Sequence, residues 1–491
     1  MESHGTNFGI LTRDNKLPGE VAITGLQNRN TPAVIRHAAQ TQVWVGAIVL
    51  ALLALQFLLL DVGAPSVALE VVVILVICVA SLANNSPTGI WAPAPLFLIV
   101  LGVFHLGLAP YWVFGIDPML QRSADYIWFS GPVGVKSLLL CGLAIVSYTI
   151  GVATVTLLRD RSRSRFRMID FAVEEERTGR FANAGAVILA AGLVAWAVMV
   201  YSAGGLEIFV APYQEFLATT NGSVLSKLYM VIAFGLVLTL MAPIRGPRAV
   251  VLGAYAVFAF FAFFLGLRGE ILFPIAAGVS VVSFRRKLLP GWVVLVGGVL
   301  ILALVNAAKV IRQSGIAGLA GEGFSASPLA AIGELGGSIR VVATTYLWHD
   351  DLAEPFRYGE TYTVAIARAM EAVLTPGARL PASEDFRLMN SEIMSRAGGI
   401  GGSAVAEAFH NFGAIGVVIV FLLLGAVFGL FSRSNISATT IALYAAVSLP
   451  LFNHVRNSFV PVVPTILAGV VAVVLISLLP TVERVWRDRR L

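Results

Sequence analysis

The chain has 491 residues, of which 57% are hydrophobic and only 13% carry a charge, with a formal net charge of +6 at pH 7. Soluble globular domains have roughly 25% charged residues, so this composition and a mean hydropathy of +0.84 exclude an ordinary soluble protein. They predict an all-α protein that crosses a membrane many times. The two cysteines, Cys78 and Cys141, lie inside apolar runs, which argues against a disulfide framework or a metal cluster.

The first 43 residues are polar and contain no long apolar segment, so we expect a tail without a cleavable signal peptide. About twelve apolar runs of spanning length follow, and each is predicted to be a transmembrane helix. They cover residues 44–60, 67–83, 90–110, 133–157, 182–201, 224–243, 250–267, 271–284, 292–308, 411–431, 436–451 and 459–479. The eighth run is short and follows a tight turn, so it is either a full span or a re-entrant segment.

Basic residues in the short linkers indicate the orientation of these runs. The linker 159–180 holds seven arginines, and further basic clusters lie at 245–248, at 285–287 and in the tail 481–491. With twelve spans, all four clusters fall on the same side as the N-terminus. Because short cytoplasmic loops are enriched in Lys and Arg, we expect both termini to be cytoplasmic.

This orientation divides the chain into five parts. They are a cytoplasmic tail 1–43, nine spans in 44–308 with the basic cytoplasmic linker 159–180, a large extracytoplasmic loop 309–402, three spans in 403–480 and a basic cytoplasmic tail 481–491. Apolar residues at helical spacing in 328–348 and 358–373 predict short helices within the large loop. We expect these helices to lie over the membrane surface, without forming a separate globular domain.

Polar residues gather where this loop enters the tenth run. The sequence GGIGGSAVAEAFHNFGAIG, residues 398–416, contains Ser403, Glu407, His410 and Asn411. Ser403, Glu407 and either His410 or Asn411 stand three to four residues apart, so they share one face of a short helix. Such groups at a membrane boundary are costly unless they are solvated, paired or used. The segment is therefore either a polar cap at the mouth of a span or part of an active site.

The sequence contains neither an Asp-x-Asp motif nor a glycine-rich phosphate loop. Its adjacent acidic pairs, at 350–351 and 384–385, are typical of solvated loop charges. The sequence thus gives no sign of a nucleotide sugar, ATP, a divalent ion or a nucleic acid as ligand. We expect no metal site and no cofactor.

Four basic residues lie instead at the predicted extracytoplasmic ends of the apolar runs: Arg268, Lys309, Arg312 and Arg456. An arginine at the centre of a bilayer costs at least about 2.5–3.5 kcal/mol, so Arg268 belongs at the outer rim. Each residue also has a purely structural interpretation, such as an ion pair with Glu270, snorkelling to the interface or capping of a helix end. Together they indicate a site for a large anion such as pyrophosphate, because a planar guanidinium forms paired, charge-assisted hydrogen bonds.

Four segments resemble the Wzy-type O-antigen and exopolysaccharide polymerases, which join oligosaccharide repeat units. Residues 399–425 resemble that family's Ser–(x)3–Glu…Asn-Phe-Gly…Gly pattern, and LRGEILFPIAAG at 267–278 resembles its Arg-Gly-Glu turn. Residues 356–381 resemble its Gly-x-Thr-Tyr stretch in the large periplasmic loop, and FNHVRNSF at 452–459 resembles its arginine before the last span. The resemblance runs from about residue 268 to 459, and the N-terminal half is similar only in topology.

The resemblance implies a C-type glycosyltransferase-like fold in the bacterial inner membrane, with a periplasmic active site that uses no metal. A growing glycan would leave undecaprenyl pyrophosphate and join a new lipid-linked unit, with a possible chain-length co-polymerase as partner. Arginine and lysine side chains would stabilise the pyrophosphate as it leaves, and a carboxylate or imidazole would accept the proton of the attacking hydroxyl. We assign Arg268, Lys309, Arg312 and Arg456 to the pyrophosphate; Glu407, His410 and Arg268 to catalysis; and Ser403, Asn411, His454 and Tyr358 to the glycan. The base is Glu407, His410 or, less favourably, His454.

Two other functions fit parts of the sequence. A transporter or lipid-linked glycan flippase would share the many spans, but its polar residues would follow a path through both leaflets. An O-antigen ligase would share the fold and the basic site. The pattern at residues 407–416 favours the polymerase over the ligase.

Overall fold

The computed structural model describes the chain except for residues 1–31, 60–61, 119–127, 161–170, 203, 206–221, 265–266, 286–327, 376–379, 433–436 and 480–491. Within the described residues, the regular structure consists of α-helices and short 3₁₀ helices, and it contains no strand. Five helices are long and apolar enough to cross a membrane. They are α2 (Pro32–Leu59), α3 (Ala64–Asn84), α7 (Pro132–Asp160), α8 (Phe171–Ser202) and α18 (Ala404–Phe431).

Shorter apolar helices complete the bundle. They are α4 (Pro93–Leu106), α10 (Gly222–Thr239), α11 (Pro247–Phe264), α12 (Arg268–Ser283), α19 (Ala438–His454) and α20 (Val462–Leu478). The segments between them include η1 (Gly89–Trp91), α5 (Ala109–Phe114), α14 (Pro328–Leu335), α15 (Ser338–Asp350), α16 (Glu360–Leu374), η4 (Ala382–Glu384) and α17 (Met389–Ala397). The prediction of an all-helical, polytopic membrane protein is therefore confirmed.

Eleven of the predicted runs coincide with helices, and the run 292–308 lies outside the described residues. The run 90–110 is not one continuous helix, because α4 ends before Gly107 and a proline at position 110 lies at the start of α5. Helix α2 begins at Pro32, inside the segment predicted as a polar tail. Proline suits a helix start because its fixed φ is preorganised there and its missing N–H would have had no intrahelical partner.

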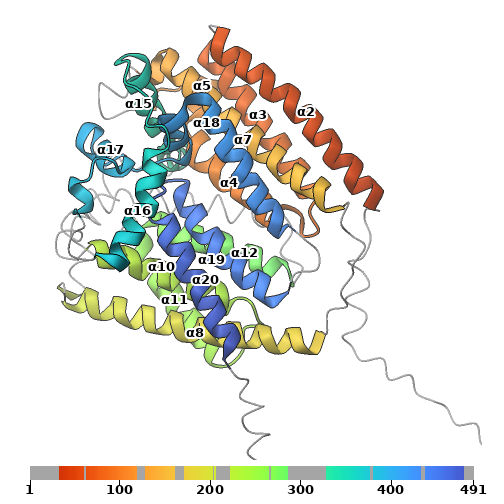
Figure 1. Ribbon diagram of the computed structural model, residues 1–491, viewed down its shortest axis with the longest axis vertical. Helices are drawn as coiled ribbons and strands as arrows, with labels where there is room; N and C mark the ends of the chain where they lie inside the picture. Colours follow the sequence, from red (N-terminus) through yellow and green to blue (C-terminus); the bar gives the residue numbers. More distant parts are fainter. Residues whose placement is uncertain are drawn as a thin grey trace, which may run out of the picture.

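Helix α7 is the centre of the larger hydrophobic core and is buried over most of its length. It packs against α2, α3, α4, α15 and α18. A second, smaller core lies among α8, α10, α11 and the start of α12. Figure 1 shows α2, α3, α4 and α7 gathered at one end of the molecule and α8, α10 and α11 at the other, with α19 and α20 between them.

Glycines bring α7 and α18 into backbone contact. A Cβ on Gly151 would lie 2.1 Å from the carbonyl oxygen of Leu422, and one on Gly425 would lie 2.0 Å from that of Tyr148. Gly429, one turn further along α18, lies against Val152. Small residues four apart let apolar helices approach closely in a membrane, so Gly425 and Gly429 fix how α18 sits on α7.

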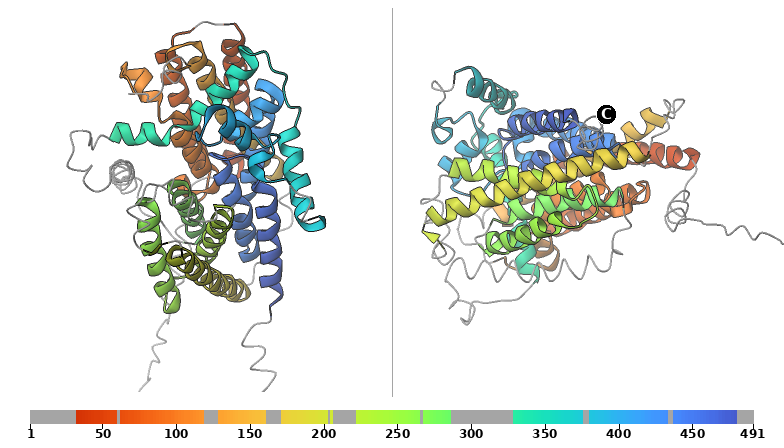
Figure 2. Two further views of the ribbon diagram at one scale, coloured as in Figure 1. Left: turned by 90° about the vertical axis from the view of Figure 1, so that its left-hand side faces the viewer. Right: turned by 90° about the horizontal axis from the view of Figure 1, so that it is seen from below.

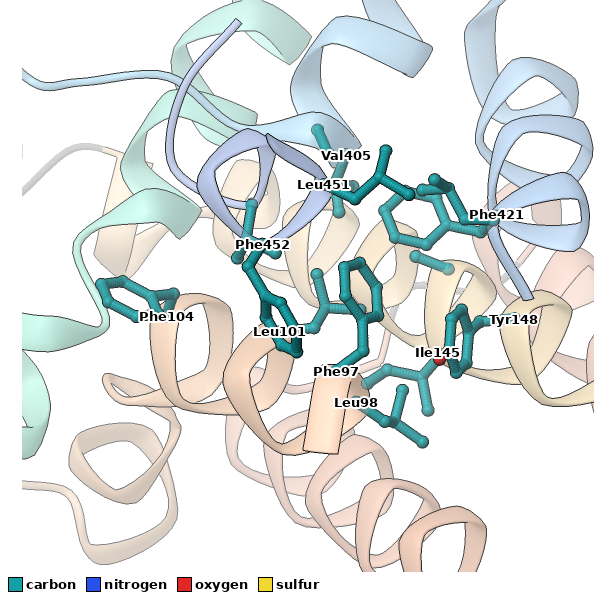
Figure 3. Close-up of a cluster of buried hydrophobic side chains, with 14 of the residues drawn as sticks. Phe97, Leu98, Leu101, Phe104, Ile145, Tyr148, Val405, Phe421, Leu451 and Phe452 are labelled. Carbon is teal, nitrogen blue, oxygen red and sulfur yellow. The ribbon is translucent and has the colours of Figure 1, made fainter. Parts of the chain in front are cut away.

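Aromatic side chains of α4 join this pair of helices to α19. The Phe97 ring lies 5.0 Å from the Tyr148 ring of α7, 4.5 Å from the Phe428 ring of α18 and 5.6 Å from the Phe452 ring of α19. Figure 3 shows Phe97, Tyr148 and Phe452 converging in this core. This packing joins the last turn of α18 to the last turn of α19.

The large loop forms helices over 328–348 and 358–373, as predicted, and its described part builds no core of its own. Helix α15 packs against α4, α7 and α18, and its Val341, Val342 and Ala343 are fully buried. The sequence predicts loop helices that lie over the membrane surface, whereas α15 is part of the larger core because apolar residues cover more than one of its faces. Helix α16 instead packs along α20.

Candidate active site

Helix α18 is kinked after its first two turns. Phe412 has φ −141° and Gly413 has φ 64° and ψ −157°, so the residues up to Asn411 and the apolar segment beyond form two helical pieces. The first piece starts at Ser403, whose hydroxyl accepts a hydrogen bond from the N–H of Ala406 (3.2 Å), as expected of a helix N-cap. Glycine makes the kink possible, because other residues rarely adopt a positive φ.

A turn from the large loop satisfies the carbonyls that the kink leaves free. Arg357 donates its backbone N–H to the carbonyl of His410 (3.0 Å), and Tyr358 donates to that of Asn411 (2.9 Å). Tyr358 itself has φ 47° and Gly359 has φ 91°, so this turn holds a conformation that costs backbone energy. The loop is therefore fastened to the kink through main-chain bonds.

Glu407 and its partners lie between α18 and the turn that joins α19 to α20. The Glu407 carboxylate is fully buried, and its Oε2 accepts the backbone N–H of Phe459 (2.7 Å) and lies 3.8 Å from Nδ1 of His454. Its Oε1 has no hydrogen bond of standard geometry within the described residues, although Thr361 lies beside it. Asn411 donates to the hydroxyl of Thr361 (2.7 Å) and to the carbonyl of Glu407 (2.8 Å).

His410 faces a different set of partners, all from the large loop. Its Nδ1 lies 2.9 Å from Nε2 of His349, and its Nε2 lies 3.2 Å from the Glu392 carboxylate. Glu392 also accepts hydrogen bonds from Arg357 (2.8 Å) and Arg396 (3.1 Å). Both ring nitrogens of His410 are thus engaged by protein groups.

Charge balance in this network depends on Glu392. Burial alone would raise the pKa of its carboxyl, but the hydrogen bond with His410 and the ion pair with Arg357 outweigh burial and lower the pKa to about 2. Burial lowers the pKa of His349, the other histidine of the pair. Arg396 continues the network to Glu354 (2.5 Å) and stacks over the Trp348 ring at 3.9 Å. These side chains form a continuous polar layer where the large loop meets α18.

Arg456 lies on the other side of Glu407, in the turn after α19. Its carbonyl accepts the N–H of Gly402 (2.9 Å), which ties the turn to the start of α18. Its half-buried guanidinium lies 5.7 Å from the centre of the Phe104 ring and close to Glu270 of α12. Within the described part of the chain, no hydrogen bond or ion pair occupies this guanidinium.

The structure therefore brings some of the sequence-predicted residues together. Glu407, His454 and Arg456 meet through the α19–α20 turn, and Glu270 places the first turn of α12 beside Arg456. Arg268 is the first residue of α12, but its side chain, like all of Lys309 and Arg312, lies outside the described residues. Their predicted convergence on a pyrophosphate remains a prediction.

Three of the four predicted glycan-binding residues, Ser403, Asn411 and His454, are buried around Glu407, and the fourth lies on the surface. Ser403 is buried and lies 2.7 Å from Nε2 of His105, and Asn411 is fully buried. Tyr358 is 77% exposed, on the loop side of the kink. Of the four predicted residues, Tyr358 alone presents a large free surface, and His454 is buried against Glu407.

Sequence analysis missed several members of the site. His105 is a lone histidine inside an apolar run, which is a signal of a functional or paired group in a membrane protein. Glu392, Arg357 and Arg396 look like ordinary loop charges, because their pairing depends on the folded loop, and His349 directly precedes the acidic pair 350–351. Among the described residues, no three His, Cys, Asp or Glu side chains are grouped so that they could hold a metal ion.

The family model for "O-antigen polysaccharide polymerase Wzy" matches residues 44–483. The chain belongs to this family. The match extends the resemblance well beyond residues 268–459, into the N-terminal half. This Wzy-family polymerase is also similar to Protein CapE of Staphylococcus aureus, with 21% identity over 376 residues, covering 74% of this chain and 79% of that protein. No solved structure matches it. Membership of the family makes the chain a membrane-bound polymerase of polysaccharide biosynthesis, acting on lipid-linked glycan.

Proposed function

We propose that this polymerase transfers a growing glycan from undecaprenyl pyrophosphate to a new lipid-linked repeat unit, at the periplasmic face of the bacterial inner membrane. The proposal includes about twelve spans in a C-type glycosyltransferase-like fold, cytoplasmic termini and a transfer step without a metal. A chain-length co-polymerase is a further proposed partner. The pyrophosphate bond supplies the driving force, so the reaction uses no ATP.

One observation carries the proposal. The Arg456 guanidinium is half-buried at the junction of α4, α12 and the α19–α20 turn, and among the described residues it has no hydrogen-bond partner. A guanidinium held in place and not neutralised by a hydrogen-bonded carboxylate suits an oxyanion that gains charge during the reaction. Arg268, Lys309 and Arg312 are proposed to complete the pyrophosphate site.

Glu407 is the best candidate for the group that accepts a proton from, or orients, the acceptor hydroxyl. It lies behind the turn that carries Arg456, and its Oε1 lacks a hydrogen bond of standard geometry within the described part of the chain. His410 is the weaker candidate, because His349 and Glu392 engage both of its nitrogens. Catalytic contacts often tighten only when substrate is bound, so the burial of Glu407 is compatible with this role.

The experiment is a gene deletion complemented by variants, with the lipid-linked glycans separated on gels. Arg456→Ala should lower polymer formation by roughly 10²–10³-fold and leave single repeat units on the lipid. Arg177→Ala is the matched control, because Arg177 is a half-exposed arginine at the opposite end of the bundle, paired with Glu174. Normal polymer length with Arg456→Ala would refute the assignment of Arg456.

The deletion itself separates the alternative functions. Single repeat units on the outer leaflet are expected of a missing polymerase. Long polymer left on undecaprenyl pyrophosphate would instead indicate a ligase, and complete loss of the outer-leaflet intermediate would indicate a flippase.

A further inference from the structure

Helices α16 and α20 enclose an apolar groove of about 330 Å³ that opens to the outside of the bundle. It is lined by Ile366, Ala369, Met370 and Leu374 of α16 and by Val463 and Leu467 of α20. Met370, Leu374 and Leu467 are all more than half exposed. Figures 1 and 2 show α16, which belongs to the large loop, running alongside α20.

The groove begins next to the candidate active site. The Tyr362 ring packs edge-on against the Phe459 ring at 5.1 Å, and the N–H of Phe459 is the group bound by Glu407. Ile366 follows Tyr362 by four residues, and Val463 follows Phe459 by four. Side chains four apart lie on one face of a helix, so the α16 wall continues directly from this aromatic pair, and Val463 of the other wall lies in the first turn of α20.

The groove then leads away from the site along α16. Ile366, Met370 and Leu374 form one stripe, and the helix rises about 12 Å from residue 366 to residue 374. This is somewhat less than half of the roughly 30 Å thickness of a bilayer's hydrocarbon core. Among the residues that the structure describes, the lining contains no charged or hydrogen-bonding side chain.

Helix α16 is anchored from its other side, so the groove has a firm wall. Arg368 and Asp385 form a buried ion pair with an Nη1–Oδ2 distance of 2.7 Å, and Arg368 also donates to the carbonyl of Leu380 (3.0 Å). Met370 adds a flexible side chain that adapts to an irregular apolar ligand.

We propose that the polyisoprenoid tail of the lipid-linked donor lies in this groove while its pyrophosphate faces Arg456. Arg456 precedes Phe459 by only three residues, so the head of such a lipid and the start of the groove are adjacent. The apolar lining holds a hydrocarbon chain through van der Waals contacts, and such a chain needs no polar partner along its path. The inference rests on the proposed function, because it takes the headgroup position from that proposal.

The test uses the full chain in lipid nanodiscs and a radiolabelled polyprenyl pyrophosphate that carries no sugar. Leu467→Trp fills the groove and should weaken binding of this probe at least tenfold. Leu423→Trp is the matched control, since Leu423 of α18 is 58% exposed and Leu467 is 57% exposed; it should change binding less than twofold. Ala369→Phe fills the groove from the other wall and should reproduce the effect of Leu467→Trp.

Inorganic pyrophosphate separates the two proposals. It should compete for the headgroup position equally well in the unaltered protein and in Leu467→Trp, because the groove variant leaves Arg456 untouched. Full polyprenyl pyrophosphate affinity in both groove variants would overturn the groove and leave the proposed function standing. Failure of the unaltered protein to bind polyprenyl pyrophosphate at all would count against the proposed function itself.

A photoreactive polyprenyl pyrophosphate needs no variant and covers the case in which the groove variants do not fold. Crosslinks in the unaltered protein should map to α16 and α20. Crosslinks confined to other helices would overturn the inference. The inference would also be overturned if a phospholipid acyl chain occupied the groove and the polyprenyl probe failed to displace it. Crosslinking of a second protein molecule across the groove would overturn it as well.

Discussion

At the scale of single residues, Glu392 is the charge on which the polar layer between the large loop and α18 depends. Its carboxylate is 6% exposed and receives Arg357, Arg396 and His410. Removing one partner of such a group is costly, because the remaining charges stay near the interior without compensation. Arg357 and Arg396 are partly exposed, which reduces this cost.

We predict that Glu392→Gln destabilises the protein by about 1.5–3 kcal/mol at neutral pH, the range for hydrogen bonds to charged groups. The effect should depend on pH in a defined direction. Because the pKa of Glu392 is lowered in the folded state from 4.5 to about 2, its stabilisation is fully present above pH 4.5 and is lost as the pH falls toward 2. The difference in melting temperature between the two proteins should therefore shrink below about pH 4.5.

The control for this measurement is Glu384→Gln, which removes an exposed carboxylate from the same loop. It should change the free energy of unfolding by less than about 0.5 kcal/mol. Asp385 also has a lowered pKa, but its partners are Arg368 and Arg387, so it titrates in both proteins and cancels in the comparison. A gap between the proteins that is constant from pH 7 to pH 3 would contradict the role of Glu392.

Residue types that stand out in an apolar chain could be predicted, but their partners could not. Glu407 stands out in the sequence because a carboxylate at a membrane boundary is costly unless it is solvated, paired or used. That it binds the N–H of Phe459, 52 positions away, depends on the packing of α18 against the α19–α20 turn. Likewise, the bond between His349 and His410 crosses 61 positions, and no local pattern indicates it.

At the scale of helices, the close crossing of α7 and α18 positions the first turns of α18. We predict that Gly425→Ala destabilises the protein by about 1–3 kcal/mol, the usual cost of overpacking. The reason is that its Cβ would meet the backbone carbonyl of Tyr148, which cannot rotate away. The measurement is the thermal unfolding of the purified protein, followed by intrinsic fluorescence.

Gly253→Ala on α11 is the control for the crossing. A Cβ there meets nothing within 4 Å, and alanine favours a helix by about 1 kcal/mol over glycine, so this variant should be neutral or stabilising. Equal melting temperatures for Gly425→Ala and Gly253→Ala would show that the close α7–α18 contact does not determine the stability of the protein.

Helix positions followed from apolar length, since a run of about 20 apolar residues forms a helix in a bilayer. Breaks within a run were harder to predict. The kink at Phe412 and Gly413 needs both a glycine and an external donor for the freed carbonyls, and the donors are the N–H groups of Arg357 and Tyr358. Sequence alone indicated the glycine but not the donors.

At the scale of the whole molecule, the described helices have two chemically different ends. One end carries the candidate site, and the other carries arginines that bind helix C-termini. Arg159 donates to the carbonyl of Leu430 at the end of α18 (2.7 Å), and Arg180 to that of Ser477 at the end of α20 (3.2 Å). Cations are stabilised there by the helix dipole, and clusters of arginine favour the cytoplasmic side.

Helix α20 gives the distance between these ends. Its 17 residues span about 25 Å, close to the thickness of a bilayer's hydrocarbon core, roughly 30 Å. The aromatic pair of Phe459 and Tyr362 lies before its start, and Arg180 lies at its end. The two ends should therefore face opposite aqueous compartments.

The last prediction tests this orientation by cysteine labelling in a background of Cys78→Ala and Cys141→Ala. Ser383→Cys, exposed in η4 of the large loop, should react with a membrane-impermeant maleimide in right-side-out vesicles. Glu175→Cys, exposed in the first turns of α8, should react only after detergent opens the vesicles. The reverse pattern would place the candidate site on the cytoplasmic side and so contradict a periplasmic polymerase. Labelling of both cysteines without detergent would show that α20 does not separate two compartments.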